Sequence, residues 1–340
     1  MTFAIGIGIG TQNSLGEWLE VFYPTPLLHP AADITQTIAA QLHHTAGNAA
    51  IQISAVQCQA LCAALKAIGH AFDWLNSMTN TQRPLVVTIL ETDAAPTSTP
   101  EVYLKLHLLS HRLVKPHTIN LTGIFGLLPN VAWTDEGAID IRELAQRQLQ
   151  ARLNGRVLEV SSVDKFPKMA NYVVPSGVRV AHTARVRLGA YLGEGTTIMH
   201  EGFVNFNAGT EGPGMVEGRI SAGVVVGKGS DIGGGASTMG TLSGGNNVVI
   251  ALGEGCLLGA NAGVGIPLGD RCTIEAGLYI TAGSVVTLID STGKAAGSCK
   301  ARELASKSDL LFRRNSKTGA IECLTNKSAI ELNEALHKHN

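Results

Sequence analysis

The chain has 340 residues, a globular composition and almost no net charge. Hydrophobic residues make up 45%, charged residues 16%, and the formal net charge is -1. This composition is too apolar for a disordered chain and too weakly charged for a protein that binds nucleic acid by neutralising phosphates. No basic leader opens the sequence, and no apolar run reaches the roughly 18 residues of a membrane span. We therefore expect a cytoplasmic protein without nucleic-acid or membrane partners. Its six cysteines form no CxxC pair, and we expect them to be free thiols.

Residues 1–165 have the pattern of an α/β domain. The opening AIGIGIG alternates with period two, as a strand does, and it does not complete a GxGxxG nucleotide loop because residue 13 is Asn. Helical spacing of apolar residues and β-branched runs predict the following elements: helices over 33–43, 55–68 and 138–153, and strands over 84–90 and 157–163. At the other end, residues 288–340 form a short C-terminal extension, with helices expected over 300–306 and 329–337.

The central segment, residues 166–287, contains a hexapeptide repeat. Residues 174–287 hold 26 of the 39 glycines, and cutting this stretch into sixes from Val174 puts an aliphatic residue at nearly every first position. The fourth position is Gly in 11 of 17 hexads, where it suits a corner with unusual backbone angles. Three such faces make a triangular coil of 18 residues, and stacked coils bury a continuous aliphatic column. The repeat therefore predicts a parallel β-helix.

The repeat is interrupted twice, and departures from a stabilising repeat indicate functional sites. In residues 198–219 the corner glycine is replaced by Glu201 and Asn207. We expect an insertion around residues 209–214 to leave the coil there as a loop. The second interruption, residues 238–249, lacks two corner glycines.

Long motifs in and around these interruptions resemble the tetrahydrodipicolinate N-succinyltransferase family in its longer form: VDKFPKM, MHEGFVNFNAGTEGPGMVEGR, GGGASTMGTLSGG, GANAGVGIPLGD, EAGLYITAG and LLFRRNS. The resemblance implies a left-handed winding of the β-helix and a homotrimer with acyl-CoA sites between neighbouring subunits. It also implies succinyl transfer from succinyl-CoA, as a co-substrate, to the amine of ring-opened tetrahydrodipicolinate (2-amino-6-oxopimelate). This reaction leads toward diaminopimelate and lysine, and no permanently bound cofactor is expected.

The same resemblance assigns roles to particular residues. Glu217 matches the catalytic glutamate that takes the succinyl group as an acyl anhydride, whereas the residue type alone equally allows a general base for the attacking amine. Arg219 matches a donor contact, and its guanidinium suits the free carboxylate of a succinyl group. The remaining residues that match donor-binding positions are Gly234, Ser237, Ala260, Glu275, Ala276, Gly283, Lys300, Arg313, Arg314, Asn315 and Ser316.

Glu201 matches a family glutamate that binds Mg²⁺ near the threefold axis, with a catalytic partner carboxylate or a metal-free corner as alternatives. His182 and His200 are 18 residues apart and should stack on successive coils. A stacked pair raises a second hypothesis, a γ-type carbonic anhydrase, although that chemistry needs three histidine ligands. The third hypothesis is a non-catalytic β-helix scaffold, which would need neither the Glu217–Arg219 motif nor the Arg-Arg-Asn-Ser segment.

Overall fold

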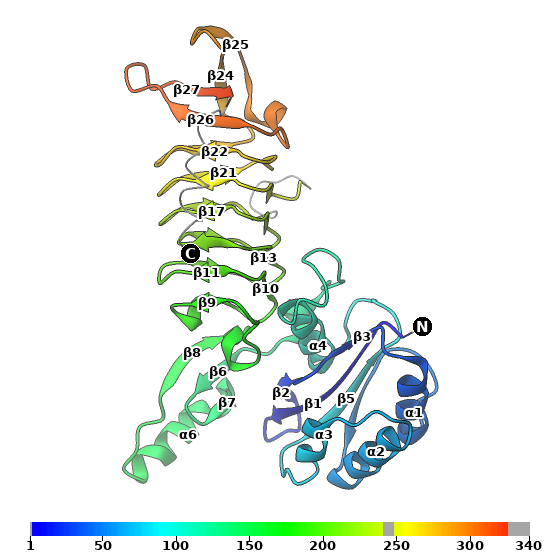
Figure 1. Cartoon of the computed structure of the whole chain (residues 1–340). Coiled ribbons are helices and arrows are strands. Elements are labelled where there is room, and N and C mark those ends of the chain that lie inside the picture. The colour runs from blue at the N-terminus through cyan, green and yellow to red at the C-terminus, as the bar shows by residue number, and fades with distance from the viewer. Residues whose placement is uncertain (1, 241–247, 326–340) are drawn as a thin grey trace. The chain divides into compact units, whose positions relative to one another are not determined.

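A computed structural model describes residues 2–240 and 248–325 of the chain (Figure 1). The chain folds into two compact units. The first contains the residues up to 173, except for two short segments, 115–117 and 168–170. The second contains these two segments and the residues from 174 onward. None of the described helices is long and apolar enough to cross a membrane. The helix expected over residues 329–337 and most of the second interruption, at residues 241–247, lie outside the described residues.

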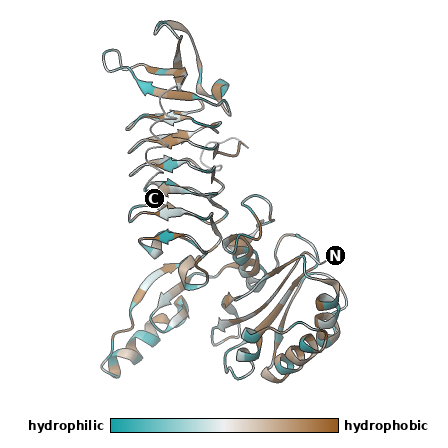
Figure 2. Ribbon diagram, viewed as in Figure 1, coloured by the Kyte–Doolittle hydropathy of each residue, from teal (hydrophilic) through white to brown (hydrophobic). Residues whose placement is uncertain are grey.

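An antiparallel sheet forms the centre of the first unit, with strand order β2-β1-β5-β4 and with β3 also paired to β1. Its strands are β1 (Ala4–Gln12), β2 (Trp18–Phe22), β3 (Leu27–Leu28), β4 (Ala49–Ile53) and β5 (Leu85–Leu90). Figure 2 shows β1 and β5 as largely hydrophobic. The alternation of AIGIGIG has a packing explanation: Ile5 and Ile7 enter the core, while a methyl group on Gly6 would lie 2.5 Å from the Tyr23 ring. The predicted opening strand is confirmed.

Helices surround this sheet. They are α1 (Ala32–Leu42), α2 (Ala55–Ala67), α3 (Asp73–Met78), α4 (Thr99–Ser110) and α5 (Ile124–Leu127). The first two confirm the predicted helices, and Ser54 begins α2 with a capping box that it shares with Gln57. The helix α4 was not predicted, because it is buried on all sides and therefore lacks the one-sided apolar pattern.

A second, three-stranded sheet completes the first unit, with order β7-β6-β8. It consists of β6 (Val131–Thr134), β7 (Gly137–Asp140) and β8 (Val160–Asp164), with helix α6 (Ile141–Leu153). The predicted helix over 138–153 thus begins later, because residues 137–140 pair with β6 and Asp140 caps the helix by accepting from the Arg142 amide at 2.8 Å. The strand predicted over 157–163 also begins three residues later.

The second unit is a parallel β-helix with three faces. The first face contains β9 (Arg179–Val180), β11 (Thr196–Ile198), β14 (Gly214–Val216), β17 (Asp231–Ile232), β20 (Leu257–Leu258) and β22 (Thr273–Ile274). The second contains β12 (Phe203–Val204), β15 (Arg219–Ile220), β18 (Ser237–Thr238), β21 (Gly263–Gly265) and β23 (Tyr279–Thr281). The third contains β10 (Ala190–Leu192), β13 (Ala208–Thr210), β16 (Val225–Val226) and β19 (Ala251–Leu252).

Stacked aliphatic side chains fill the β-helix, as the repeat predicts. From β11 to β22 of the first face, the inward residues are at most 1% exposed: Ile198, Val216, Ile232, Leu258 and Ile274. Corners carry the expected backbone, since Gly235 has a φ of 70° and Asn207, which replaces a corner glycine, has a φ of 49°.

One expectation about the first interruption is wrong. Residues 209–214 do not leave the coil as a loop: β13 pairs with β10, and Gly214 pairs with Thr196, each at the regular spacing of 18 residues. The irregular step lies further on, between Val216 and Ile220. These two residues pair with Ile198 and Val204, which are six apart, so the intervening corner is two residues shorter than the one beneath it.

The C-terminal segment continues the first face of the β-helix. It contains β24 (Val285–Ile289), β25 (Ala295–Lys300), β26 (Leu310–Arg314) and β27 (Ile321–Thr325). Phe312 pairs with Ile274 and is fully buried, so β26 takes the position of a further coil. The helix predicted over 300–306 is one short 3₁₀ turn, Ala301–Leu304.

Candidate active site

Five of the predicted site residues lie in one column on a corner of the β-helix. The strands β14, β17, β20 and β22 are successive neighbours in one parallel sheet, and each ends at this corner. Because the strands pair in register, the residues that follow them stack above one another. Glu217 and Glu275 come first after their strands, and Gly234, Ala260 and Ala276 come second, so the five form two adjacent rows of the same corner.

The shortened corner carries Glu217 and Gly218. The Glu217 amide donates to Ile232 O at 2.8 Å, which ties the corner to the coil above it. A methyl group on Gly218 would lie 2.4 Å from Ala236 O, so only glycine fits there. The Glu217 side chain is half-buried, and its Oε2 lies 3.8 Å from the position that a methyl group on Gly234 would occupy. The carboxylate therefore faces the next member of the column, where glycine leaves open space.

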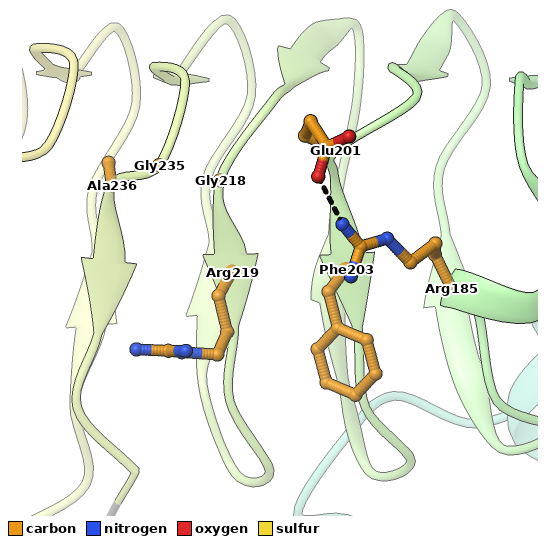
Figure 3. A pocket seen from close by; sticks show the side chains of 7 residues that line it. All are labelled: Arg185, Glu201, Phe203, Gly218, Arg219, Gly235 and Ala236. Carbon is orange, nitrogen blue, oxygen red and sulfur yellow. Dashed lines mark hydrogen bonds and ion pairs between the residues drawn. The ribbon is translucent and has the colours of Figure 1, made fainter.

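Arg219 and Ser237 meet on the adjoining face. They are paired residues of β15 and β18, and the guanidinium donates to Ser237 Oγ from Nη2 at 2.7 Å and from Nε at 3.2 Å. Figure 3 shows the Arg219 side chain extended toward the coil of Ala236. One guanidinium edge is thus anchored, and its remaining donors are available to a carboxylate.

A hollow of about 460 Å³ lies beside this corner (Figure 3). It is lined by Arg185, Glu201, Phe203, Gly218, Arg219, Gly235 and Ala236. Of these, only Glu201 and Arg219 were predicted as site residues. Strand pairing is the signal that would have identified Arg185 and Phe203. Arg185 is level with Phe203 on the next coil, and Phe203 pairs with Arg219 on the coil after that.

Two of the C-terminal candidates, Arg313 and Asn315, bind the same buried carboxylate. Glu322, on β27, accepts from Arg313 Nε at 2.9 Å and from Asn315 Nδ2 at 2.7 Å. The hydrogen bond from Asn315 and the bond and charge of Arg313 lower the pKa of Glu322, so this carboxylate stays ionised. Both donors are therefore held in place by a residue that the sequence did not single out.

Arg314 joins this cluster to the corner column. Its amide donates to Glu275 Oε2 at 2.6 Å, and its Nη1 donates to Gly319 O at 3.1 Å. Gly283 and Lys300 lie at one end of the β24–β25 hairpin, where Val285 pairs with Lys300. Ser316 is exposed in the turn that follows β26.

Glu201 has two side-chain partners, an ion pair with Arg185 and a hydrogen-bond contact with His200. Its Oε2 accepts from Arg185 Nη2 at 2.5 Å, and its Oε1 lies 3.0 Å from His200 Nδ1. These two neighbours lower the pKa of the carboxyl, the hydrogen bond with His200 contributing most. Within the described part of the chain, no three potential metal ligands lie together. Inside one chain Glu201 is therefore an ion-pair acceptor, and the Mg²⁺ site expected between three converging copies stays a prediction.

The two histidines of the repeat are neighbours, as predicted. The His182 and His200 rings lie edge to face with centroids 5.3 Å apart. A zinc site of the carbonic anhydrase type would need a third histidine beside them, and the described residues provide none there.

Comparisons with known proteins decide the family. Residues 45–126 match the profile described as tetrahydrodipicolinate N-succinyltransferase N-terminal, residues 128–168 match its middle part, and residues 249–282 match the hexapeptide repeat of succinyl-transferase. A 2,3,4,5-tetrahydropyridine-2,6-dicarboxylate N-succinyltransferase of Pseudomonas paraeruginosa is 66% identical over 339 residues, 99% of this chain and 98% of its own. The chain belongs to the tetrahydrodipicolinate N-succinyltransferase family.

Other members of the family agree over the full length. The Vibrio cholerae protein of the same name is 59% identical over 340 residues, covering 99% of both chains. A solved structure from Campylobacter jejuni, titled a putative 2,3,4,5-tetrahydropyridine-2-carboxylate N-succinyltransferase, superposes with a TM-score of 0.90. It is 32% identical and the match covers 97% of this chain and 93% of that one. These members of the tetrahydrodipicolinate N-succinyltransferase family are enzymes by name, which leaves the non-catalytic scaffold without support.

Proposed function

We propose that the chain transfers the succinyl group of succinyl-CoA to the amine of 2-amino-6-oxopimelate, the ring-opened form of tetrahydrodipicolinate. The products are N-succinyl-2-amino-6-oxopimelate and CoA, on the route to diaminopimelate and lysine. The observation that carries this proposal is the 66% identity to a named N-succinyltransferase along almost the whole of both chains.

Glu217 performs the chemistry in this proposal, by one of two routes. In the first, its carboxylate attacks the thioester carbonyl, the C–S bond breaks and CoA thiolate leaves. The acceptor amine then attacks the mixed anhydride, the C–O bond to Glu217 breaks, and the freed carboxylate takes the proton that the amine loses. In the second, the amine attacks the thioester directly while Glu217 accepts its proton. The C–S bond then breaks, and the leaving CoA thiolate takes up the proton from Glu217. The half-buried carboxylate facing Gly234 along the corner column supports either route.

The other residues hold the donor. Arg219, anchored on Ser237, binds the free carboxylate of the succinyl group, and Gly234, Ala260 and Ala276 leave room along the corner for the pantetheine arm. At the end of the column, Arg313, Arg314, Asn315, Ser316 and Lys300 supply the positive charge and donors that phosphates need. Gly283 and Glu275 complete the donor set, Glu275 by holding the Arg314 amide.

The test is an assay of succinyl transfer. Purified chain is supplied with succinyl-CoA and the acceptor, free CoA thiol is measured, and the N-succinyl product is identified by mass spectrometry. Glu217→Gln should lower kcat by at least about a hundredfold, the lower end for a lost general base. Glu254→Gln is the matched control, since Glu254 is an exposed corner glutamate outside the column. Near-normal kcat in Glu217→Gln would remove both routes.

A second measurement separates the two routes. Incubation with succinyl-CoA alone should release CoA before the acceptor arrives if an anhydride forms, and hydroxylamine should then capture the succinyl group. The general-base route yields neither result.

The proposed enzyme is a cytoplasmic homotrimer of left-handed β-helices, with residues 1–165, 166–287 and 288–340 as its three parts. The parallel three-faced coil supports the β-helix on which this assembly rests. Light scattering of the active protein should give the mass of three chains. Glu201 pairs with Arg185 and His200 within one chain, and neither route above involves Mg²⁺.

A further inference from the structure

One face of the β-helix aligns two arginines with an aromatic ring between them. Val186 pairs with Val204, so Arg185 is level with Phe203, and Phe203 in turn pairs with Arg219. Adjacent strands lie about 4.8 Å apart, so Arg185 and Arg219 originate two coils, or roughly 10 Å, apart. All three residues line the hollow beside Glu217.

The two guanidiniums bind different partners. Arg219 leans onto Ser237, away from Arg185, while Arg185 leans onto Glu201 at the level of Phe203 (Figure 3). The half-buried Phe203 ring lies between them and offers an apolar surface. Along the hollow, a cationic side chain is followed by an apolar one and then by a second cationic one. This order suits a ligand whose carboxylates are joined by methylene groups.

Arg185 keeps donors for a ligand. Its guanidinium has five N–H groups, and the one side-chain bond described for it runs from Nη2 to Glu201 at 2.5 Å. The side chain is 38% exposed and faces the hollow. Glu201 acts as a positioning residue, because one of its oxygens binds the Arg185 guanidinium and the other lies 3.0 Å from His200 Nδ1.

We propose that Arg185, oriented by Glu201, binds the acceptor carboxylate that lies farthest from the reacting amine. The inference rests on the proposed function, in which Arg219 holds the carboxylate of the succinyl group. The amine must meet the thioester beside Glu217, level with Arg219. The far end of a seven-carbon dicarboxylate then extends away from Arg219 past Phe203, toward Arg185, the second arginine that lines the hollow.

The experiment compares two acceptors that differ only at the far end. The probe 2-aminopimelate has an amine and both carboxylates, and 2-aminoheptanoate lacks the distal one. In the wild type, kcat/KM should favour 2-aminopimelate by about 10- to 100-fold, as for one charged hydrogen-bonded contact. Arg185→Gln should lower kcat/KM for 2-aminopimelate by a similar factor and equalise the two acceptors. The donor KM should not change.

Three further variants complete the test. Arg185→Lys should recover part of the preference, because it restores charge without the planar fork. Glu201→Gln should raise the acceptor KM while leaving the donor KM unchanged, which a loss of overall stability would not do. Arg179→Gln, an exposed arginine on another face, is the control and should behave as wild type.

The proposal fails if Arg185→Gln keeps the wild-type preference, if it slows both acceptors equally, or if it raises the donor KM by the same factor. Calorimetric binding of 2-aminopimelate to wild type and Arg185→Gln, without donor, separates this failure from that of the proposed function. A wild type that binds the dicarboxylate through Arg185 but transfers no succinyl group would refute the proposed function alone.

Discussion

Gly234→Ala tests whether the donor lies along the corner column. A methyl group there would lie 3.8 Å from Glu217 Oε2, in ordinary contact, and no other described atom outside the adjoining residues lies within 4 Å. The folded chain therefore accommodates alanine without strain. Because alanine has less freedom than glycine in the unfolded chain, the free energy of unfolding should rise by about 0.4–1 kcal/mol.

Donor binding should respond in the opposite direction. A pantetheine arm running along the column would collide with the new methyl group, and overpacking of a close contact costs about 1–3 kcal/mol. This corresponds to a donor Kd raised by about 5- to 150-fold. The assay is calorimetric titration with CoA, together with donor and acceptor KM values and a urea unfolding curve.

Gly218→Ala provides the contrast. Its methyl group would lie 2.4 Å from Ala236 O and 2.7 Å from Gly233 O, so the backbone must shift and unfolding should become easier by about 1–3 kcal/mol. If Gly234→Ala is at least as stable as wild type and still binds CoA with wild-type affinity, the donor does not lie on this corner.

Three further predictions concern the C-terminal cluster and the first unit. Arg313→Ala and Arg314→Ala should raise the donor KM more than they lower kcat, and added salt should raise the wild-type donor KM, since phosphate contacts are ionic; unchanged donor KM values would assign both arginines to structure. Glu322→Gln should raise the donor KM without changing the acceptor KM, because it releases Arg313 from its partner; an unchanged value would mean that this orientation is irrelevant. Burial lowers the pKa of His107 from 6.5 to about 3. Between these pH values the unfolded chain binds a proton at His107 that the folded chain does not. The free energy of unfolding should therefore fall as the pH drops from 6.5 toward 3. Urea unfolding of wild type and His107→Gln checks this, and equal pH slopes would refute it.

The sequence was sufficient to predict the β-helix, because six-residue periodicity is a local property. An aliphatic residue at each first position has one low-energy arrangement, a stacked inward column, and Ile198, Val216 and Ile232 occupy it. The family followed from long motifs around Glu217. The buried helix α4 escaped prediction because a helix covered on every side carries no polar face to mark its period.

Which residues become neighbours across coils was decided by the tertiary structure. Strand pairing sets the register between coils, and one short corner changes every alignment beyond it. The four-residue step from Val216 to Ile220 puts Arg219 sixteen residues after Phe203 rather than eighteen. A search at the regular spacing of eighteen residues therefore does not align Arg185 with Arg219. The sequence determined the chemistry available, a carboxylate and several arginines. Their geometry depends on summed corner lengths and on ion pairs such as that of Glu201, which form only once the coils have stacked.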